Sequence, residues 1–190
     1  STLLGRAYAF PKNESELVTL YGNKSGSYRV SSSAIKLTRT MMAALDDMFD
    51  AFFAETGSRD YQITQGYRTY DEQAAIYDDY QEIYGAEQGA LLAARPGYSE
   101  HHTGMAIDMN VYTASGVSYS LATAGAADPI YGWIYENAAK YGLVLRYPDS
   151  KTTVTGITNE PWHFRYVGRG HAAYMAENGL VLEEYLALLY

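Results

Sequence analysis

Between residues 34 and 56, apolar side chains recur at every third or fourth position. They are Leu37, Met41, Leu45, Met48 and Phe52. This spacing places them on one face of an α-helix, and Gly57 follows as the expected stop.

A second helix is predicted from the capping-box spacing of Thr69 and Glu72, and it is expected to end at Gly85. A short helix over residues 87–94 follows. Later patterns predict a helix over residues 130–141, and one or two helices over residues 170–189 with a break at Gly179.

Four stretches have the pattern of β-strands: residues 61–67, 104–111, 143–146 and 162–167. The second stretch alternates, with Met105, Ile107 and Met109 on one side and Ala106, Asp108 and Asn110 on the other. In the fourth stretch, His163 and Arg165 lie opposite Trp162, Phe164 and Tyr166.

The remaining segments show little regular pattern. Residues 1–33 are expected to form an irregular N-terminal segment, and the small, polar residues 114–128 a surface loop. Since no repeat or linker divides the rest, the sequence predicts a single compact α+β domain over residues 34–190.

The composition limits which functions and which metal ligands are possible. Hydrophobic residues make up 47% of the chain, as in globular proteins, and the formal net charge of -8 argues against nucleic-acid binding. Because there is no cysteine, a metal ion would have to be held by Asp, Glu or the four His.

No apolar run approaches the ~20 residues that span a bilayer. Residues 1–10 lack the pattern of a signal peptide, although the start at Ser1 is compatible with a removed export signal.

The first candidate for a chemical site surrounds Asp108, on the small-residue side of its predicted strand. His101 precedes this strand, and a tight turn at Gly104 would fold it back toward Asp108. A histidine and a carboxylate placed in this way are suitable ligands for a divalent cation.

The second candidate is the run Glu160-Pro161-Trp162-His163. Pro161 favours an extended backbone at Glu160, which places a carboxylate close to His163. Two histidines and an aspartate would leave the fourth zinc position for water, and Glu160 could take a proton from that water.

Other interpretations compete with this one. A histidine on a strand is more often a hydrogen-bonded structural residue than a ligand, and Glu100 is a rival for the role of base. We expect His102 to lie outside the ligand set and His171 to be a surface or capping residue.

The two motifs together resemble a known family. Ser99-x-His101-x-x-Gly104-x-Ala106-x-Asp108, followed by Glu160-x-Trp162-His163, is similar to the zinc D-Ala-D-Ala peptidases, especially the vancomycin-resistance-type D,D-carboxypeptidases. Their superfamily includes D-Ala-D-Ala dipeptidases, lysostaphin-type endopeptidases and the hedgehog domain. The likeness spans roughly residues 62–168. The chain departs from it at His102, where relatives often have Gln.

The resemblance implies a central antiparallel sheet that carries a zinc ion on His101, Asp108 and His163. Glu160 would activate a zinc-bound water, and Arg68 would stabilise the oxyanion. Gln73 and Ser99 match positions that line the substrate site. Trp162 is expected to pack in the core and hold His163 in place.

The implied activity is hydrolysis of the terminal D-Ala-D-Ala bond of peptidoglycan stem peptides. The alternatives are an L,D-carboxypeptidase acting on tetrapeptide stems, a D-Ala-D-Ala dipeptidase, a non-catalytic zinc-containing binding module and a structural wall domain with a vestigial site. The expected partner is a peptidoglycan stem peptide or its precursor, with no nucleic acid. The expected location is outside the cytoplasmic membrane, in the wall or held by an anchor absent from this chain. A monomer is expected.

Overall fold

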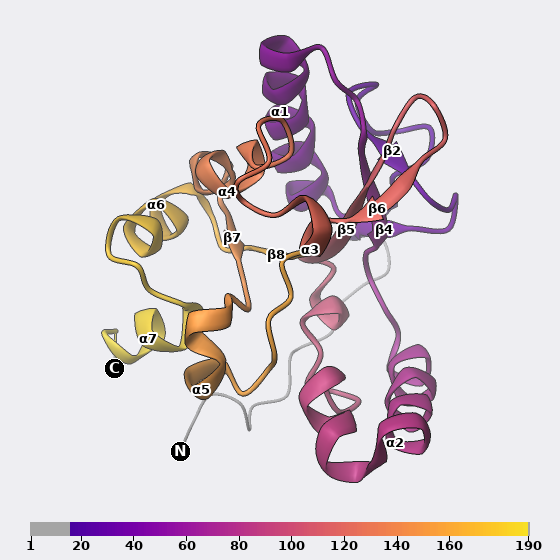
Figure 1. Ribbon diagram of the computed structural model, residues 1–190, viewed down its shortest axis with the longest axis vertical. Helices are drawn as coiled ribbons and strands as arrows, with labels where there is room; N and C mark the ends of the chain where they lie inside the picture. Colours follow the sequence, from indigo (N-terminus) through magenta and orange to yellow (C-terminus); the bar gives the residue numbers. More distant parts are fainter. Residues whose placement is uncertain (1–15, 190) are drawn as a thin grey trace.

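A mixed β-sheet runs through the centre of the computed structural model, which describes residues 16–189 (Figure 1). The strand order is β2-β4-β5-β8-β7, and β6 pairs with β5. The strands are β2 (Arg29–Val30), β4 (Tyr61–Gln65), β5 (Ala106–Tyr112), β6 (Ser118–Ser120), β7 (Leu143–Leu145) and β8 (His163–Tyr166). All pairs are antiparallel except β2–β4, which is parallel. The expected antiparallel sheet is therefore confirmed apart from one edge strand.

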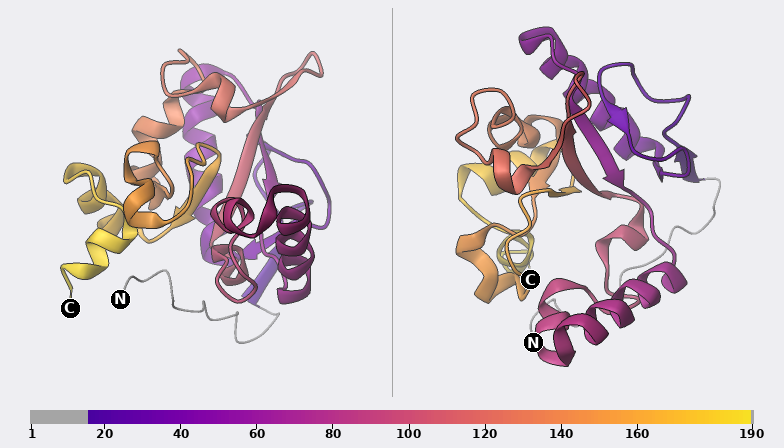
Figure 2. Two further views of the ribbon diagram at one scale, coloured as in Figure 1. Left: turned by 60° about the horizontal axis from the view of Figure 1, so that its bottom comes forward. Right: turned by 45° about the vertical axis from the view of Figure 1, so that its right-hand side comes forward.

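Helices surround this sheet. They are α1 (Arg39–Thr56), α2 (Tyr70–Leu92), α3 (Leu121–Ala124), α4 (Trp133–Asn137), α5 (Thr152–Thr155), α6 (Arg169–Glu177) and α7 (Leu182–Ala187). Within the described residues, 3-10 turns also occur at η3 (Glu100–Thr103), η4 (Ala138–Tyr141) and η5 (Asp149–Lys151). The long helix α2 lies beyond one end of the sheet, whereas α6 and α7 lie beside the β7 edge (Figures 1 and 2). The α+β class is confirmed.

The hydrophobic core forms between α1 and the sheet. The apolar face of α1 buries Met41, Leu45, Met48 and Phe52, as its spacing predicts. Thr38 caps the helix by accepting a hydrogen bond from the Met41 N–H, and Gly57 ends it in the left-handed conformation. The helix begins at Arg39 rather than at residue 34, because the preceding residues form β3 (Lys36–Thr38).

The predicted capping box starts α2, since Thr69 and Glu72 each accept a hydrogen bond from the other's backbone N–H. Gly85 interrupts the helix with φ 80° and ψ 166°, so the segment consists of two helices joined at a kink. This agrees with the two helices predicted on either side of Gly85.

Two stretches expected to be irregular contain regular structure. In the N-terminal stretch, β1 (Leu17–Thr19) pairs with β3 and β2 joins the main sheet. Leu20 and Tyr28 lie in the same buried cluster as α1, so residues 16–33 pack against the rest of the fold. Residues 1–15 lie outside the described part. The predicted loop over residues 114–128 contains β6 and α3.

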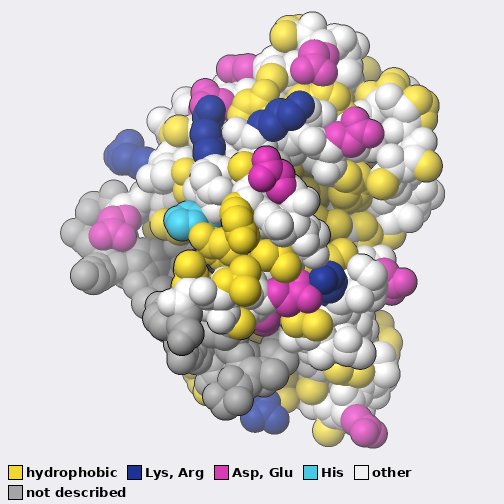
Figure 3. All heavy atoms as spheres, turned by 90° about the vertical axis from the view of Figure 1, so that its left-hand side faces the viewer, with side chains coloured by type: hydrophobic (Ala, Val, Ile, Leu, Met, Phe, Trp, Pro, Cys, Tyr) yellow, Lys and Arg dark blue, Asp and Glu magenta, His cyan; other side chains and the backbone are white. Residues whose placement is uncertain are grey.

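The predicted helix over residues 130–141 divides into α4 and η4, and the last predicted helices are α6 and α7. On the side of the molecule where α6 and α7 lie, hydrophobic side chains gather between charged ones (Figure 3). Within residues 16–189, no helix has the length and apolarity needed to cross a membrane.

Candidate active site

Asp108 on β5 and His163 on β8 are directly paired residues of neighbouring antiparallel strands. Cross-strand partners point to the same face of a sheet, so both side chains project from one side. The Nδ1 atom of His163 lies 3.0 Å from Oδ1 of Asp108. Pairing of β5 with β8 therefore joins the two motifs that the sequence singles out.

His101 reaches the same place from η3. Gly104 ends this turn in the left-handed conformation, and its N–H donates to the carbonyl of His101, as expected for a tight turn that leads into β5. The His101 Nδ1 lies 2.7 Å from the Gly66 carbonyl. Because Nδ1 donates there, Nε2 faces Asp108, at 3.4 Å from Oδ2.

The three side chains fit a metal ion. One ligand atom from each of His101, Asp108 and His163 lies within 4.8 Å of the others. Ligands ~2.1 Å from a tetrahedral zinc ion would be ~3.4 Å apart, so only small side-chain adjustments separate this arrangement from a zinc site. A His2Asp set also leaves a fourth position open.

The electrostatics of the cluster also favour a cation. Burial lowers the pKa of His163, but hydrogen bonds with Asp108 and Glu100 outweigh burial and raise it to about 10. Burial raises the pKa of Asp108, yet His101 and His163 together hold it well below its usual range. Positive charge is thus stabilised between these groups, as a proton on His163 or as a metal ion that displaces it.

Glu160 is held beside the cluster by a backbone turn. Its N–H donates to the Tyr147 carbonyl at 2.9 Å, and its own carbonyl accepts from the His163 N–H at 3.0 Å. Its Oε2 lies 3.6 Å from the His163 Nδ1. Burial is the main cause that raises the pKa of Glu160 to about 7, and the negative charges of Asp108 and Glu100 add to it.

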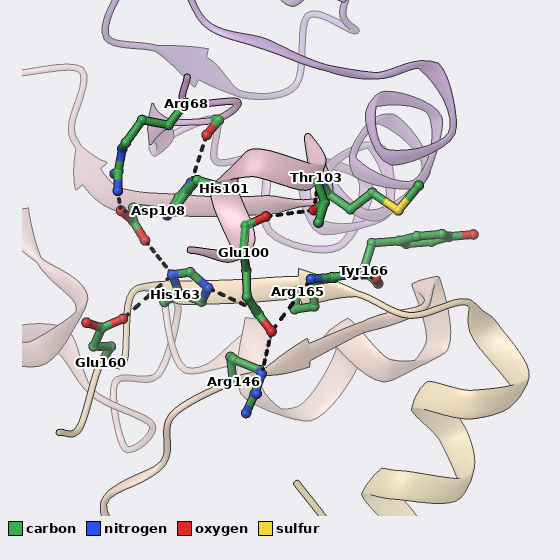
Figure 4. A network of polar contacts seen from close by, with 12 residues as sticks. Arg68, Glu100, His101, Thr103, Asp108, Arg146, Glu160, His163, Arg165 and Tyr166 are labelled. Carbon is green, nitrogen blue, oxygen red and sulfur yellow. Dashed lines mark hydrogen bonds and ion pairs between the residues drawn. The ribbon is translucent and has the colours of Figure 1, made fainter. Parts of the chain in front are cut away.

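Arg68 approaches Asp108 from the side opposite His163, with 3.9 Å between Nη2 and Oδ2 (Figure 4). Burial lowers the pKa of Arg68, which the charge of Asp108 partly offsets. Nη1 of Arg68 donates to Oε1 of Gln73 at 2.6 Å, and the Gln73 amide donates to the Ala94 carbonyl at 2.6 Å. Gln73 therefore lies in the predicted region, where it holds Arg68.

These groups open into one cleft of about 470 Å³ between the sheet and α2. Besides the residues above, its wall includes Ser99, Tyr147 and Trp162. Trp162 was expected in the core, but it is only partly buried and lines the cleft. The physical reason is that β8 starts at His163, so Trp162 still belongs to the turn that carries Glu160.

Glu100 does not occupy the position of a base. Its carboxylate lies 3.4 Å from Nε2 of His163, on the ring edge away from Glu160 (Figure 4). Burial raises the pKa of Glu100, but Arg146 and Arg165 outweigh burial and lower it well below its usual value. Pattern reasoning considered Glu100 only as a rival base, and it missed Arg146 as a functional candidate.

The other two histidines lie outside the group formed by His101, Asp108 and His163. His102 accepts from the Gly97 N–H through Nε2, and its Nδ1 lies 2.8 Å from the Arg68 carbonyl. It therefore joins the loop before η3 to the Arg68 segment. His171 contacts the Tyr185 hydroxyl on the surface.

Comparison with known proteins gives a consistent result. Residues 34–169 match the VanY family model, described as D-alanyl-D-alanine carboxypeptidase. A D-alanyl-D-alanine carboxypeptidase of Enterococcus faecium is 44% identical over 133 residues, which are 70% of this chain and 38% of that protein. The putative carboxypeptidase YodJ of Bacillus subtilis is 34% identical over 96% of this chain and 65% of its own length. The chain thus spans less than two thirds of these curated relatives.

Solved structures extend the likeness. The LdcB LD-carboxypeptidase, whose structure concerns peptidoglycan recognition, superposes with a TM-score of 0.76 at 32% identity, over 94% of this chain and 79% of that one. A mutant of the D,D-pentapeptidase VanY from a VanB-type resistance cassette, in complex with Zn(II), gives 0.71 at 31% identity, over 96% and 98%. The family model matches most of the chain, and the fold and the residue cluster agree with it. The chain therefore belongs to the VanY family of D-alanyl-D-alanine carboxypeptidases.

Proposed function

We propose that this protein is a zinc-dependent carboxypeptidase that hydrolyses the terminal D-Ala-D-Ala bond of peptidoglycan stem peptides. The observation that carries the proposal is the meeting of three kinds of group in one cleft. A metal-ligand set, the carboxylate of Glu160 and the guanidinium of Arg68 all line it. A peptide bond bound there would have all three within reach.

Zinc would be held by His101 through Nε2, by Asp108 and by His163 through Nδ1. The ring nitrogens follow from the hydrogen bonds of the opposite nitrogens, with the Gly66 carbonyl for His101 and with Glu100 for His163. When bound, zinc supplies a Lewis acid that acidifies water and polarises a carbonyl.

Glu160 is the general base in this proposal. Its carboxylate faces the same nitrogen of His163 as Asp108 does, so it borders the open side of the ligand set. It takes a proton from the attacking water and returns it to the leaving amine. Two backbone hydrogen bonds of its turn keep it in this position.

Arg68 stabilises the negative charge that develops on the carbonyl oxygen. Its largely buried guanidinium lies across the ligand set from Glu160 and is oriented by Gln73. A cation that is oriented before the reaction lowers the barrier more than a mobile one, because nothing has to reorganise when the charge appears. Ser99 lines the substrate cleft.

The substrate and location are inferred from the relatives. The Enterococcus faecium relative is a D-alanyl-D-alanine carboxypeptidase, and a VanYB structure was solved with D-alanine-D-alanine. By this likeness the protein acts on stem peptides, and therefore outside the cytoplasmic membrane at the cell wall. We also propose that it is a monomer. The proposed catalytic domain spans residues 34–190, and residues 16–33 pack against it.

An L,D-carboxypeptidase is the second candidate, because LdcB also matches this chain along most of its length. Both reactions use the same groups and differ in the configuration of the residue before the scissile bond. A D-Ala-D-Ala dipeptidase is a third variant, since a bifunctional dipeptidase and carboxypeptidase of Enterococcus gallinarum is 35% identical over 130 residues.

Product analysis separates these activities. The protein is incubated with a stem pentapeptide ending in D-Ala-D-Ala, with the tetrapeptide and with free D-Ala-D-Ala. We expect D-alanine from the pentapeptide at the highest kcat/KM, whereas preference for the tetrapeptide or dipeptide would replace the D,D assignment. Zinc binding without hydrolysis of any of the three would favour a binding module.

A further inference from the structure

A buried row of alternating charges leads from the metal-ligand cluster to the C-terminal helix. It begins at His163, whose Nε2 lies 3.4 Å from Oε2 of Glu100. The other nitrogen of the same ring, Nδ1, faces Asp108 and Glu160. The ring therefore presents one edge to the ligand cluster and the opposite edge to Glu100 (Figure 4).

Arg146 binds the carboxylate oxygen of Glu100 that does not face His163. Its Nε donates to Oε1 of Glu100 at 2.8 Å, and both side chains are almost fully buried, at 3% and 1% exposed. Arg165 adds a second positive charge at 3.6 Å from the same oxygen. An ionised carboxylate this deeply buried requires such partners.

The far end of Arg146 is held by α7. Its Nη1 donates to Oε2 of Glu183 at 2.8 Å, and its Nη2 donates to Oε1. This is a two-pronged contact between a guanidinium and a carboxylate, which fixes orientation as well as distance. Glu183 thus connects α7 to Arg146, and Arg146 in turn holds Glu100 beside His163.

Tyr147 fills the space between the histidine and the arginine. Its ring centroid lies 5.0 Å from that of His163, and the Arg146 guanidinium carbon lies 4.7 Å above the Tyr147 ring. In addition, the Arg146 N–H donates to the His163 carbonyl at 3.1 Å. Arg146 therefore supports His163 through its side chain, through Tyr147 and through its backbone.

We propose that Glu100 is a positioning residue. It accepts a hydrogen bond from Nε2–H of His163 and so directs Nδ1 of the same ring toward the metal. Arg146 and Glu183 hold Glu100 in place. Carboxylates on the far nitrogen of ligating histidines fix the tautomer and the ring orientation. The inference rests on the metal-binding part of the proposed function. It adds the C-terminal helix to the support of the site.

The test compares zinc affinity in Glu100→Gln, Glu183→Gln and Glu184→Gln. Glu184 is the matched control, because it neighbours Glu183 on α7 but pairs with Lys151 at the surface. Affinity is measured by competition with a chromogenic chelator, and the thermal unfolding of each apoprotein is recorded. Loss of an outer carboxylate is expected to weaken zinc binding by about 10- to 100-fold in Glu100→Gln. Glu183→Gln should show a smaller loss, and Glu184→Gln should match the unchanged protein.

The outcomes distinguish this inference from the proposed function. If the unchanged protein binds zinc and Glu100→Gln binds it within threefold as tightly, the positioning role is wrong and the metal site stands. If the unchanged protein binds no zinc, both are wrong. Should Glu100→Gln fail to fold, nitrogen NMR of the unchanged zinc protein decides. The inference requires a protonated Nε2 and a metal-bound Nδ1 on His163, and the reverse arrangement would overturn it.

Discussion

Asp108 and His163 face each other across β5 and β8, with 3.0 Å between Oδ1 and Nδ1. Fifty-five positions separate them in the chain, and one strand pairing brings them together. The geometry of the proposed metal site therefore depends on the register of β5 and β8, because a one-residue slip would turn one side chain to the other face of the sheet. The rest of the site is arranged around this pair.

The role of Glu160 is tested by Glu160→Gln. The amide fills the same space but cannot take a proton, so kcat should fall by ~10²–10⁴-fold, as for loss of a general base. Zinc content should stay the same, because Glu160 is not one of the ligands. The check is steady-state kinetics together with metal analysis, and Glu87→Gln on the exposed side of α2 controls for loss of a charge. Full activity in Glu160→Gln would rule out the assignment.

Gly66 is closely packed, and its carbonyl contacts His101. A Cβ at this position would lie 2.6 Å from the Lys36 carbonyl oxygen and 2.9 Å from Cγ2 of Ile35. Gly66→Ala should therefore lower the free energy of unfolding by about 1–3 kcal/mol, the usual cost of overpacking. It should also weaken zinc binding, because the Gly66 carbonyl orients His101.

Urea unfolding and chelator competition measure the two effects of Gly66→Ala. Gly26→Ala serves as the control, since a Cβ there meets no atom within 4 Å. If Gly66→Ala were as stable as Gly26→Ala, with unchanged zinc affinity, the close approach of Gly66 to Ile35 and Lys36 would have no part in holding His101.

The capping box of α2 predicts a stability effect and its pH dependence. Thr69→Ala should cost about 1 kcal/mol of unfolding free energy, as for other N-cap replacements. Hydrogen bonds from the backbone and hydroxyl of Thr69 lower the pKa of Glu72. A lowered folded-state pKa means that this contribution is complete above the unfolded pKa, which is ~4.3, and is lost as the pH falls through the folded value.

Urea titrations at pH 7 and in steps below pH 4.5 check this sign. Glu72→Gln should show a smaller loss of stability with acid than the unchanged protein, whereas Glu82→Gln, on the exposed part of the same helix, should not. A cap contribution that grew as the pH fell would contradict the lowered pKa of Glu72.

Gln73 is expected to affect rate without affecting metal. Gln73→Leu removes the partner of Arg68 while it keeps a similar volume, so the guanidinium loses its fixed orientation. A misplacement of this kind can lower kcat/KM by up to ~10²-fold. We expect at least a tenfold loss, which corresponds to about 1.4 kcal/mol of transition-state stabilisation and is similar to the contribution of one hydrogen bond, with unchanged zinc affinity. Gln88→Leu on exposed α2 is the control, and equal kinetics in the two variants would refute the positioning of Arg68 by Gln73.

Much of the candidate site could be predicted from the sequence because its residues lie in short, patterned segments. Alternation over residues 105–109 places Asp108 on the small-residue side of β5, and Gly104 marks the turn that returns His101. The spacing of Glu160 and His163 is likewise local. The resemblance then supplies what periodicity leaves open, which is that the two segments meet.

What the pattern misses depends on contacts between distant elements. Arg146 lies 46 positions from Glu100 and 37 from Glu183, and their meeting results from the packing of η3, β7 and α7. The local pattern of apolar and polar residues cannot predict a contact between such distant positions. The parallel edge strand β2 escaped prediction for a similar reason, because two residues are too few to show alternation, and it is defined by its pairing with β4.

The central claim is that the His101, Asp108 and His163 cluster holds a zinc ion used to release D-alanine from stem peptides. The most direct measurement is D-alanine release from a pentapeptide ending in D-Ala-D-Ala, before and after a chelator and again after zinc is restored. We predict release that the chelator abolishes and zinc recovers in the unchanged protein, with no recovery in His163→Ala. Release that persists after complete removal of the metal would contradict the account.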